Sequence, residues 1–528
     1  MNPRASFPWL WLPALGMALA CRSVIADPRP APTPPAPIAA PKAPDAVPAL
    51  FGLTNLWTLH LVVPAADWQT LGSRGGPQER RGMNNPGGSP PGIVGGILRG
   101  FFGGPDQPEG RPASARPPAP AEGGSRYPWA HCTVEADGQT FTNVAIRFKG
   151  VSSVVRAPNG YKRPFKLDFD REVGGRRFKG VGEVYLNNNV NDATQMREAL
   201  AYDLFRKSGI AAPHTAFARV TLTIPGRIEK QNLGLYTLVE PVGGEFLKRS
   251  FGTKKGMLLK PEMMRGLAYL GDEWPNYQAR YNPKSQPDPD EAERFVRFVR
   301  FIQEADPGEF SARLGDHLDP RSFARFVALN AILANVDSFI GNGHNYFLHV
   351  HPVSHRSTFV PWDLNESFGM HPVSGPSGDQ MKTSVLRPNA DSNRLVERFV
   401  ADPAFGPLYR EQCAWLLANV FVPSKLAADI DRIAAVTQPV VLSESRRAKE
   451  DYQRTVLGTL KPDEGDTDQP RHDQEFARDR YRPWGFPDAV EIDNIPLKAW
   501  ISGRHAQVTG ELDGRWRGTR PRPRLQPQ

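Results

Sequence analysis

The sequence predicts an α+β fold in which a strand-rich N-lobe precedes a mainly helical C-lobe. In the first half, segments such as "AHCTVEADGQTFTNVAIRFKG" alternate apolar and polar residues, which is typical of half-buried strands. In the second half, segments such as "DPDEAERFVRFVRFIQEA" place apolar residues three and four apart, which is typical of amphipathic helices. Strands followed by helices predict an α+β domain, and we expect a functional site between the lobes.

The domain is predicted to span residues 49–514, with the N-lobe reaching to about 260 and the C-lobe starting at about 285. The chain has 528 residues, and its 53 prolines and 48 glycines are too many for a uniformly folded protein of that length. A proline-rich linker at 27–48 and a glycine- and proline-rich insertion at 73–126 account for many of them. We expect both segments to be disordered.

Residues 1–26 are predicted to be a secretory signal, because Arg4 precedes a short apolar run from Phe7. Release before Asp27 is favoured, while the imperfect lipoprotein box that ends at Cys21 offers a lipid anchor as the alternative. We therefore expect a secreted, periplasmic or cell-envelope protein. No apolar run in the mature chain is long enough to predict a transmembrane segment.

Cysteine content and charge narrow the class of protein that we expect. The released chain would keep only Cys132 and Cys413, which excludes a disulfide-framework fold and leaves one bridge or two buried thiols as alternatives. The net charge of +9 comes largely from flexible parts such as "RWRGTRPRPRLQPQ". Because no nucleic-acid recognition motif accompanies this charge, we expect residues 515–528 to be a disordered basic tail and expect no nucleic-acid partner.

The predicted N-lobe elements follow in order. A strand at Leu56–Val63 precedes a short helix, and the Asp137-Gly138 turn predicts a hairpin in the alternating segment quoted above. Further strands are predicted in "RPFKLDFD", "FARVTLTI" and "NLGLYTLVEPV". The segment "DATQMREALAYDLFRKSG" predicts a helix with Asp192 as its cap and Gly209 at its end.

The predicted C-lobe is helical except for one hairpin. Helices are expected in the segment starting at Asp288, in "DPRSFARFVALNAILANV" with Asp319 as cap, in "FGPLYREQCAWLLANVF" and in "PLKAWISGRHAQVTGELDG". The hairpin is expected in "NYFLHVHP" and "STFVPWDL". It interrupts a stretch, 335–369, that is dense in polar residues.

The polar residues fit the requirements of phosphoryl transfer from a nucleotide, which needs amides over the phosphates, a strand lysine, a base and metal ligands. The turn Lys149–Ser153, "KGVSS", offers amides and hydroxyls. Lys166 lies in the middle of a strand, where a lysine needs an anionic partner. The alternative for Lys149–Ser153 is an ordinary hairpin turn, and the alternative for Lys166 is a lysine on an exposed strand face.

The base and metal ligands have candidates in the second half. Asn342 follows Asp337, which we expect to close a helix, by five residues, the offset between base and metal-binding asparagine in the protein-kinase catalytic loop. Asp363 at a strand end can hold Mg²⁺ or Mn²⁺ with help from Asn342 or Asn345. Taken one at a time, each aspartate has a simpler structural interpretation: Asp337 caps a turn and Asp363 ends a strand. Taken together, the order of these residues along the chain favours a catalytic site.

The chain resembles the CotH family, which is named for a spore-coat protein and contains divergent secreted or coat-associated kinases. The resemblance covers roughly Leu56 to Gly514 apart from the insertion. It is carried by "VAIRFKGVSS", "KRPFKLDF", "QMREALAYDLFRKSGIAAPHTAFARV", "LGLYTLVEPV", "NVDSFIGNGHNYFLH" and "VPWDLNESFG". It implies a protein-kinase-like bilobal fold and, as cofactors, ATP with Mg²⁺ or Mn²⁺.

The resemblance also implies which N-lobe residues would bind the nucleotide. Lys149, Gly150, Ser152 and Ser153 would face the phosphates, and Lys166 would orient them. Glu198 is the candidate ion-pair partner of Lys166, with Arg197 and Asp203 as competitors on the same helix. The segment from Glu240 to Val242 would be the hinge that meets the adenine.

For the C-lobe the resemblance implies the catalytic and metal-binding positions. Asp337 would accept the proton of the acceptor hydroxyl, Asp363 would hold the metal, and Asn342 or Asn345 would be a further ligand. The acceptor would be a Ser or Thr hydroxyl, in the chain itself or in an exported partner protein. Asn365 departs from the family pattern, because many relatives carry a second aspartate there, and a neutral side chain weakens a second metal site.

Two other functions stay open. A non-catalytic structural or adhesive protein can use the same fold, because fold does not fix function. A zinc hydrolase would combine His349 and His351 with His344 or Asp363, although no HExxH motif occurs and a His-x-His pair on an exposed strand face is an ordinary surface feature.

Overall fold

The computed structural model describes residues 46–72, 127–150, 160–262, 264–372, 374–390, 392–460 and 495–522. All of them lie in one compact unit that extends from Ala43 to Gln528. The predicted signal (1–26), nearly all of the linker (27–48) and the insertion at 73–126 lie outside the described residues. The α+β class is confirmed, whereas the kinase-like bilobal arrangement stays a prediction.

The strands of the first half form a closed barrel with the order β1-β2-β3-β4-β5-β7-β6. Its strands are β1 (Leu56–Val62), β2 (Ala130–Ala136), β3 (Gln139–Phe148), β4 (Phe165–Asp168), β5 (Glu183–Asn187), β6 (Thr215–Ile224) and β7 (Ile228–Val239). The predicted turn between β2 and β3 is confirmed, with Asp137 and Gly138 both at positive φ, as the tight hairpin turn requires.

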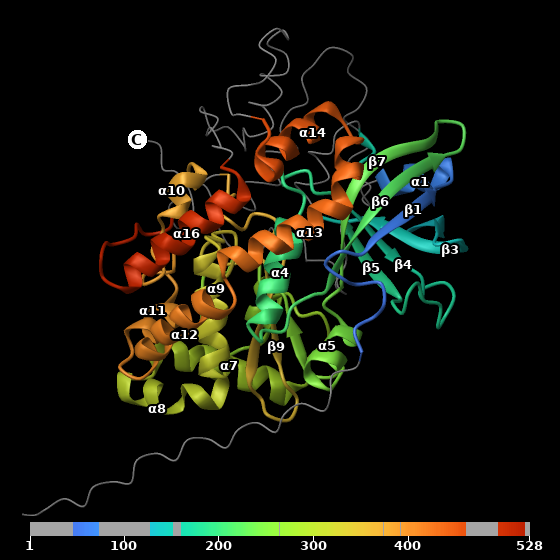
Figure 1. Ribbon diagram of the computed structural model, residues 1–528. Helices are drawn as coiled ribbons and strands as arrows, with labels where there is room; N and C mark the ends of the chain where they lie inside the picture. Colours follow the sequence, from blue (N-terminus) through green and yellow to red (C-terminus); the bar gives the residue numbers. More distant parts are fainter. Residues whose placement is uncertain are drawn as a thin grey trace, which may run out of the picture. The chain divides into compact units, whose positions relative to one another are not determined.

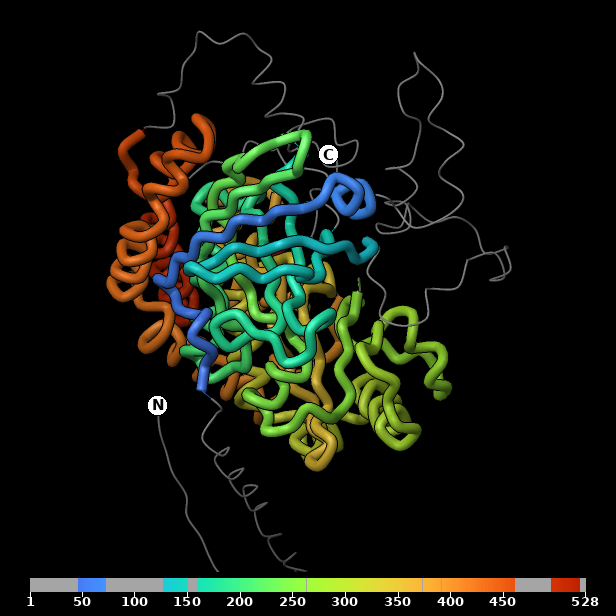
Figure 2. The backbone as a smooth tube through the Cα atoms, turned by 90° about the vertical axis from the view of Figure 1, so that its right-hand side faces the viewer, coloured from blue at the N-terminus to red at the C-terminus, as the bar shows by residue number. Residues whose placement is uncertain are grey.

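The barrel closes through a parallel pairing of β1 with β6, from Leu56 opposite Phe217 to Val62 opposite Thr223. Every other ladder of the barrel is antiparallel. Figure 2 shows β1 in blue between the green strands β6 and β7 and the cyan strands β2 and β3. The sequence did not predict this closure, because the two paired segments are about 160 residues apart and no local pattern marks a parallel partner.

Helices cover one side of the barrel and build the second half (Figure 1). In chain order they are α1 (Ala65–Gly72), α4 (Arg197–Lys207), α5 (Gly244–Phe251), α6 (Pro275–Tyr281), α7 (Pro289–Glu304), α8 (Pro307–His317), α9 (Pro320–Ile332), α10 (Ser377–Met381), α11 (Arg394–Ala401), α12 (Phe405–Asn419), α13 (Pro423–Leu442), α14 (Arg446–Tyr452), the π-helix η3 (Gln453–Leu457) and α16 (Leu497–Leu512). In Figure 1, α4 lies between the barrel and the helices of the second half.

Two apolar clusters hold these parts together. The smaller one fills the barrel, with Leu61, Ile146 and Leu167 fully buried. The larger one unites the helices of the second half with α4 and with the inner residues of β6 and β7. Because Leu200 and Leu204 of α4 belong to that larger cluster, α4 is packed on the helical part while it remains adjacent in sequence to the barrel.

Of the two predicted helix caps, Asp319 is confirmed and Asp192 is not. Asp288 forms a capping box with Glu291 at the start of α7, and the Asp319 side chain accepts a hydrogen bond from the Ser322 amide at the start of α9. Asp192, the predicted cap of α4, lies five residues before the helix. Its carboxylate instead accepts the Arg197 amide (2.8 Å) and pairs with the Arg197 guanidinium.

A small three-stranded sheet, with the order β10-β9-β8, lies in the second half. It consists of β8 (Met257–Leu259), β9 (Tyr346–Val350) and β10 (Ser357–Pro361), and the last two form the predicted hairpin. Every residue of β9 is buried. The expectation that His349 lies on an exposed strand face is therefore wrong: its side chain is fully buried and stacks on Phe251 with ring centroids 4.5 Å apart.

The structure also bears on the expectations for the two cysteines, the C-terminal tail and a transmembrane segment. Cys132 and Cys413 are separate buried thiols, and burial raises the pKa of Cys413 to about 12.

Part of the expected disordered tail is ordered, since Thr519 exchanges backbone hydrogen bonds with Lys382 and Ser384. Within the described residues no single helix is long and apolar enough to cross a membrane, although α12 and α13, bent by 53° at their junction, pass that test together by length and composition.

Candidate functional site

The loop between α9 and β9 builds the centre of the candidate site. Asp337 does not close a helix as predicted, because α9 ends at Ile332 and the chain then folds back on itself. Glycine is required at two positions of this fold: a Cβ on Gly341 would lie 1.8 Å from the Val336 carbonyl oxygen, and one on Gly343 would lie 2.4 Å from the Met264 carbonyl group. The tight fold brings the residues after Gly341 back to Asp337.

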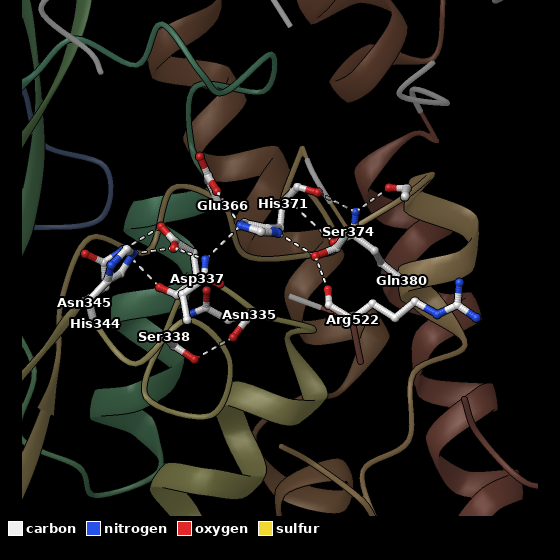
Figure 3. A network of polar contacts seen from close by, with 12 residues as sticks. Asn335, Asp337, Ser338, His344, Asn345, Glu366, His371, Ser374, Gln380 and Arg522 are labelled. Atoms are coloured by element: carbon white, nitrogen blue, oxygen red, sulfur yellow. Dashed lines mark hydrogen bonds and ion pairs between the residues drawn. The ribbon is translucent and has the colours of Figure 1, made fainter. Parts of the chain in front are cut away.

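Three side chains of this loop donate hydrogen bonds to the Asp337 carboxylate, and Figure 3 labels two of them, His344 and Asn345. Asn342 Nδ2 lies 2.9 Å from Oδ1, His344 Nε2 lies 2.5 Å from the same oxygen, and Asn345 Nδ2 lies 2.7 Å from Oδ2. Both amide side chains thus turn their nitrogen toward Asp337. Their carbonyl oxygens are the atoms that could accept a metal ion.

The charges of Asp337 and His344 support each other. Burial disfavours the charged carboxylate, but the neighbouring His344 and the hydrogen bonds outweigh this effect and hold the pKa of Asp337 well below its usual range. Burial likewise opposes the imidazolium of His344, while Asp337 and Asp363 raise the pKa of His344. Asp337 is therefore ionised at neutral pH.

Asp363 lies just beyond the end of β10, where the hairpin meets α4. Its backbone amide donates to the hydroxyl of Tyr202 on α4 (2.9 Å), and the preceding Trp362 amide donates to the carbonyl of Asn345 (3.0 Å). Asn345 and Asp363 both adopt a positive φ, an uncommon backbone conformation for residues other than glycine. These bonds fix Asp363 between the Asp337 loop and α4.

Lys149 reaches the same place from the end of β3. Its ammonium donates to Oδ1 of Asn187 on β5, and Asn187 Nδ2 donates to both carboxylate oxygens of Glu198 on α4 (2.9 and 2.7 Å). The ammonium also lies 4.9 Å from the ring centroid of Tyr185 and 5.8 Å from that of Trp362. An asparagine therefore joins a lysine and a glutamate that both come from elements of the first half.

The pKa shifts of Lys149 and Glu198 show that these two side chains and Asp363 influence one another electrostatically. Burial lowers the pKa of Lys149, and the charges of Asp363 and Glu198 oppose that shift. Burial and the charge of Asp363 raise the pKa of Glu198 to about 7, against the effects of Lys149 and Asn187. Lys149, Glu198 and Asp363 thus form one electrostatic group, and Asp363 joins it to His344 and Asp337.

Lys166 lies near this group, with its ammonium 5.7 Å from the ring centroid of Tyr185, but it is paired with a different carboxylate. Lys166 lies on β4 beside Arg147 of β3 and Tyr185 of β5, and its ammonium pairs with Glu183 at 2.8 Å. The predicted pairing of Lys166 with Glu198 is therefore wrong. The competitors on α4 are engaged elsewhere, since Arg197 pairs with Asp192 and Asp203 pairs with Arg206 and Lys207.

The other residues that were predicted to bind the nucleotide contact protein groups or lie outside the described residues. Arg249 pairs with the carboxylate of Glu240, and the Glu240 backbone amide donates to His214 (2.9 Å), so neither group is directed at a ligand. Val242 packs at the edge of the larger apolar cluster. Gly150 is exposed at positive φ, whereas Ser152 and Ser153 lie outside the described residues.

Sequence reasoning missed several residues of the site. Glu366 and His371 approach Asp337 from the side opposite His344 (Figure 3), and their ligand atoms lie with those of Asp337 within 4.8 Å of one another. Both follow Asp363 closely in sequence, which is the signal that could have found them. Asn187 lies in "YLNNNVND", where nothing singles it out from its neighbours.

The histidines of the hairpin do not assemble a metal site. His349 Nε2 contacts the carbonyl of Lys255, and Nδ1 of His351 accepts the amides of Val353 and Ser354. Among the His, Cys, Asp and Glu side chains that the structure describes, Asp337, Glu366 and His371 are the three whose ligand atoms gather closely enough to hold one metal ion. The zinc-hydrolase arrangement expected from His349 and His351 is thus not formed there.

Comparison with known proteins gives two matches. A family described as "CotH kinase protein" matches residues 146–482, which is more than half of the chain. The chain is also similar to the inner spore coat protein H of Bacillus subtilis (strain 168), with 22% identity over 286 residues that make up 53% of this chain and 74% of that protein. The family match includes Lys149, Glu198, Asp337 and Asp363.

Proposed function

The chain belongs to the CotH kinase family, and from this premise we propose that it is an exported atypical kinase. It transfers the γ-phosphoryl group of ATP to a Ser or Thr hydroxyl of a secreted or surface protein and depends on Mg²⁺ or Mn²⁺. The observation that carries this proposal is the meeting of Lys149, Glu198 and Asp363 from three elements next to an ionised Asp337.

Lys149 is the residue that we assign to the nucleotide phosphates. Its ammonium lies near the acidic groups Asp363 and Glu198, and the sequence that follows it, "GVSS", contains one glycine and two serines. A strand lysine linked to a helix glutamate is the arrangement that orients phosphates in protein kinases. Lys166, assigned to this role by sequence, is held by Glu183 instead.

The metal ligands that we propose are Asp363, Asn342 and Asn345. Carboxylate and amide oxygens are the donors that Mg²⁺ and Mn²⁺ prefer, and the amide nitrogens of both asparagines are already committed to Asp337. The donor set therefore fits a hard divalent cation. Such a cation neutralises charge on the transferred phosphoryl group.

Asp337 is the proposed acceptor of the hydroxyl proton. Its low pKa makes it a weak base, yet phosphoryl transfer passes through a loose transition state in which positioning and charge stabilisation dominate. Three hydrogen-bond donors fix the carboxylate. Its contribution is thus to orient the acceptor hydroxyl more than to remove its proton early.

Export rests on the predicted signal sequence at residues 1–26. The similar Bacillus protein is named as a spore coat protein, which supports an extracellular or surface location for this chain as well. The acceptor would then be another exported protein or the chain itself.

Incubation with labelled ATP and Mn²⁺ tests the proposal. We expect transfer of label by the wild type and its loss in Asp337→Ala and in Asp363→Ala. Each variant must keep the wild-type thermal unfolding profile for the comparison to count. If the folded wild type binds no nucleotide, the kinase proposal fails.

A structural or adhesive role is the second candidate, and the coat-protein name of the Bacillus relative favours it. In that case the same charged residues would stabilise the fold alone. Asp363→Asn would then change thermal stability without changing any nucleotide-dependent property, whereas a kinase would lose metal-dependent nucleotide binding in this variant.

A further inference from the structure

A second group of polar side chains lies on the other side of Asp337 from His344 and Asn345 (Figure 3). It consists of Glu366 and His371, which follow the β10 strand in sequence. The ligand atoms of Asp337, Glu366 and His371 all lie within 4.8 Å of one another. The His371 residue is 4% exposed, so its ring is oriented by the protein and not by solvent.

The hydrogen bonds of His371 identify its tautomer. Nδ1 lies 2.5 Å from the Ser374 hydroxyl, which donates its own proton to the carbonyl oxygen of Arg522 (2.6 Å), so the hydroxyl must accept from Nδ1–H. On the opposite side of the ring, Nε2 lies 3.2 Å from the amide nitrogen of Asn342, which can only donate. Both contacts require a proton on Nδ1 and a lone pair on Nε2.

The lone pair of His371 faces two carboxylates. Glu366 Oε2 lies 3.8 Å from Nε2, and the Asp337 carboxylate shares with Nε2 the same donor, Nδ2 of Asn342. Imidazole nitrogen and carboxylate oxygen are both metal ligands, and a single cation placed among these three groups can contact all of them. Histidines that bind metals characteristically donate their other N–H to an oxygen that fixes the ring, as His371 does to Ser374.

We propose that Asp337, Glu366 and His371 form a binding site for one transition-metal cation of the zinc class. Zn²⁺ binds imidazole nitrogen and carboxylate oxygen at about 2.0–2.2 Å, which places neighbouring ligand atoms about 3.4 Å apart, close to the separation of Nε2 and Oε2. Three protein ligands leave the fourth tetrahedral position open. Rotation of the Asn342 amide would present its oxygen instead of its nitrogen.

The site differs in chemistry from the one proposed for the nucleotide metal. An imidazole ligand favours zinc and other transition metals, whereas oxygen-only sets such as Asp363 with the asparagines suit Mg²⁺ and Mn²⁺. Binding at the new site does not depend on the proposed kinase function. If that function holds, a cation on an Asp337 oxygen removes the carboxylate from the acceptor hydroxyl, so that the site is inhibitory.

Cobalt titration of the full chain, stripped of metal and free of nucleotide, tests the proposal. We expect one Co²⁺ per chain with the strong visible absorption of a four- or five-coordinate ion, and stoichiometric displacement by Zn²⁺. Glu366→Gln and His371→Ala should abolish this absorption. Ser374→Ala should lower the affinity about 10- to 100-fold, because the Ser374 hydroxyl orients the ring without touching the metal.

Asp363→Ala is the matched control, because it removes a neighbouring carboxylate that is not a ligand of this site. It should keep the cobalt spectrum and an affinity within about threefold of wild type. The proposal is overturned if Glu366→Gln and Ser374→Ala, with circular dichroism spectra like that of wild type, bind Co²⁺ as wild type does. It is equally overturned if Asp363→Ala alone abolishes binding, or if the wild type shows only weak octahedral absorption.

An activity measurement separates the two proposals. In wild type, Zn²⁺ should inhibit Mg²⁺-ATP-dependent transfer, and the inhibitory concentration should rise in Ser374→Ala by the same factor as the cobalt dissociation constant. Absence of any transfer would count against the kinase alone and would leave the cobalt result to decide the metal site.

Discussion

The ammonium groups of Lys149 and Lys166 lie 4.9 and 5.7 Å from the ring centroid of Tyr185, and substitution can decide which of these two lysines binds the nucleotide. Lys149 is tied through Asn187 to Glu198, whereas Lys166 is paired with Glu183. We expect Lys149→Met to lower the rate of phosphoryl transfer about 10²- to 10³-fold, as loss of one charge-stabilising group does. Lys166→Met should lower it by less than about tenfold, because Glu183 and not the phosphate group determines the position of Lys166.

The measurement is transfer from labelled ATP at saturating and subsaturating nucleotide, with thermal unfolding of both variants as the control. The reverse order, with transfer lost in Lys166→Met and kept in Lys149→Met, would restore the assignment that the sequence pattern favours. That pattern placed Lys166 correctly on a strand. It could not show that Lys149, one residue beyond β3, is joined through Asn187 to Glu198 while Lys166 pairs with Glu183, because both contacts arise between elements.

The titration of Glu198 should make folding depend on pH. Its pKa is raised from the unfolded value of 4.5 to about 7, first by burial and then by the charge of Asp363. Between these values the folded state holds a proton that the unfolded state has lost, so the free energy of unfolding falls as pH rises through this window. Because of Glu198, we expect the free energy of unfolding to fall by about 1–3 kcal/mol between pH 5 and pH 8.

Urea denaturation at both pH values checks this prediction, with Glu198→Gln as the comparison. The variant carries no titrating group at this position, so its stability should fall less than that of wild type over the same interval. An identical pH dependence of the two proteins would show that Glu198 is ionised in the folded state at neutral pH.

At the scale of single elements, the loop between α9 and β9 depends on glycine. Gly343 has a φ of +75°, and an added Cβ would meet the Met264 carbonyl group at 2.4 Å. Gly138 in the β2–β3 turn has a similar φ of +71° with no atom within 4 Å. Gly138→Ala should therefore lower the free energy of unfolding by about 1 kcal/mol from backbone strain, and Gly343→Ala by at least about twice as much.

Chemical denaturation of the two variants gives both values. Gly343→Ala should in addition weaken phosphoryl transfer, because the residues after Gly343 hold Asp337. Equal stability losses in the two variants would mean that the loop moves away from Met264 at little cost.

A buried ion pair ties the end of α13 to the barrel. Lys162 and Glu444 have side chains that are 8% and 12% exposed, and Glu444 also accepts the amide of Leu235 on β7 (3.1 Å). Removal of one partner leaves a buried charge without compensation. We expect Glu444→Gln to lower the free energy of unfolding by about 3 kcal/mol.

The matched control is the exposed pair of Lys254 and Glu245, with side chains 54% and 62% exposed. Glu245→Gln should cost less than about 1 kcal/mol. Both variants are compared by urea denaturation at one pH. A loss of stability in Glu444→Gln no larger than that in Glu245→Gln would show that α13 is not held to the barrel by this contact.

Elements and their order could be read from local patterns, but their long-range pairing could not. The hairpin at Asp137-Gly138 and the cap at Asp319 were predictable because a turn or a helix start is a property of a few consecutive residues. The β1–β6 closure joins segments about 160 residues apart, and burial of both faces of β9 depends on what packs there. The same limit hid Asn187 and His371, whose roles arise only from contacts across the fold.

At the scale of the whole molecule, the candidate site draws on both halves of the chain. Lys149 and Asn187 come from the barrel, Glu198 and Tyr202 from α4, and Asp363 from the hairpin of the second half. The sequence could predict that distant motifs belong to one site, because their joint order resembles that of a known family. It could not predict which lysine arrives there.

A ligand that contacts both halves should stabilise the whole fold against unfolding. If ATP with Mn²⁺ binds the folded chain alone, nucleotide at about 100 times its dissociation constant adds about 2.7 kcal/mol to the free energy of unfolding. We expect a rise in the thermal midpoint of wild type that requires both ATP and Mn²⁺, because Lys149 engages the phosphates and Asp363 the metal. Differential scanning fluorimetry with ATP alone, Mn²⁺ alone and the two together measures it. Asp363→Asn should lose the joint effect while keeping a midpoint near that of wild type without ligand, whereas a structural coat protein would show no joint effect in either chain.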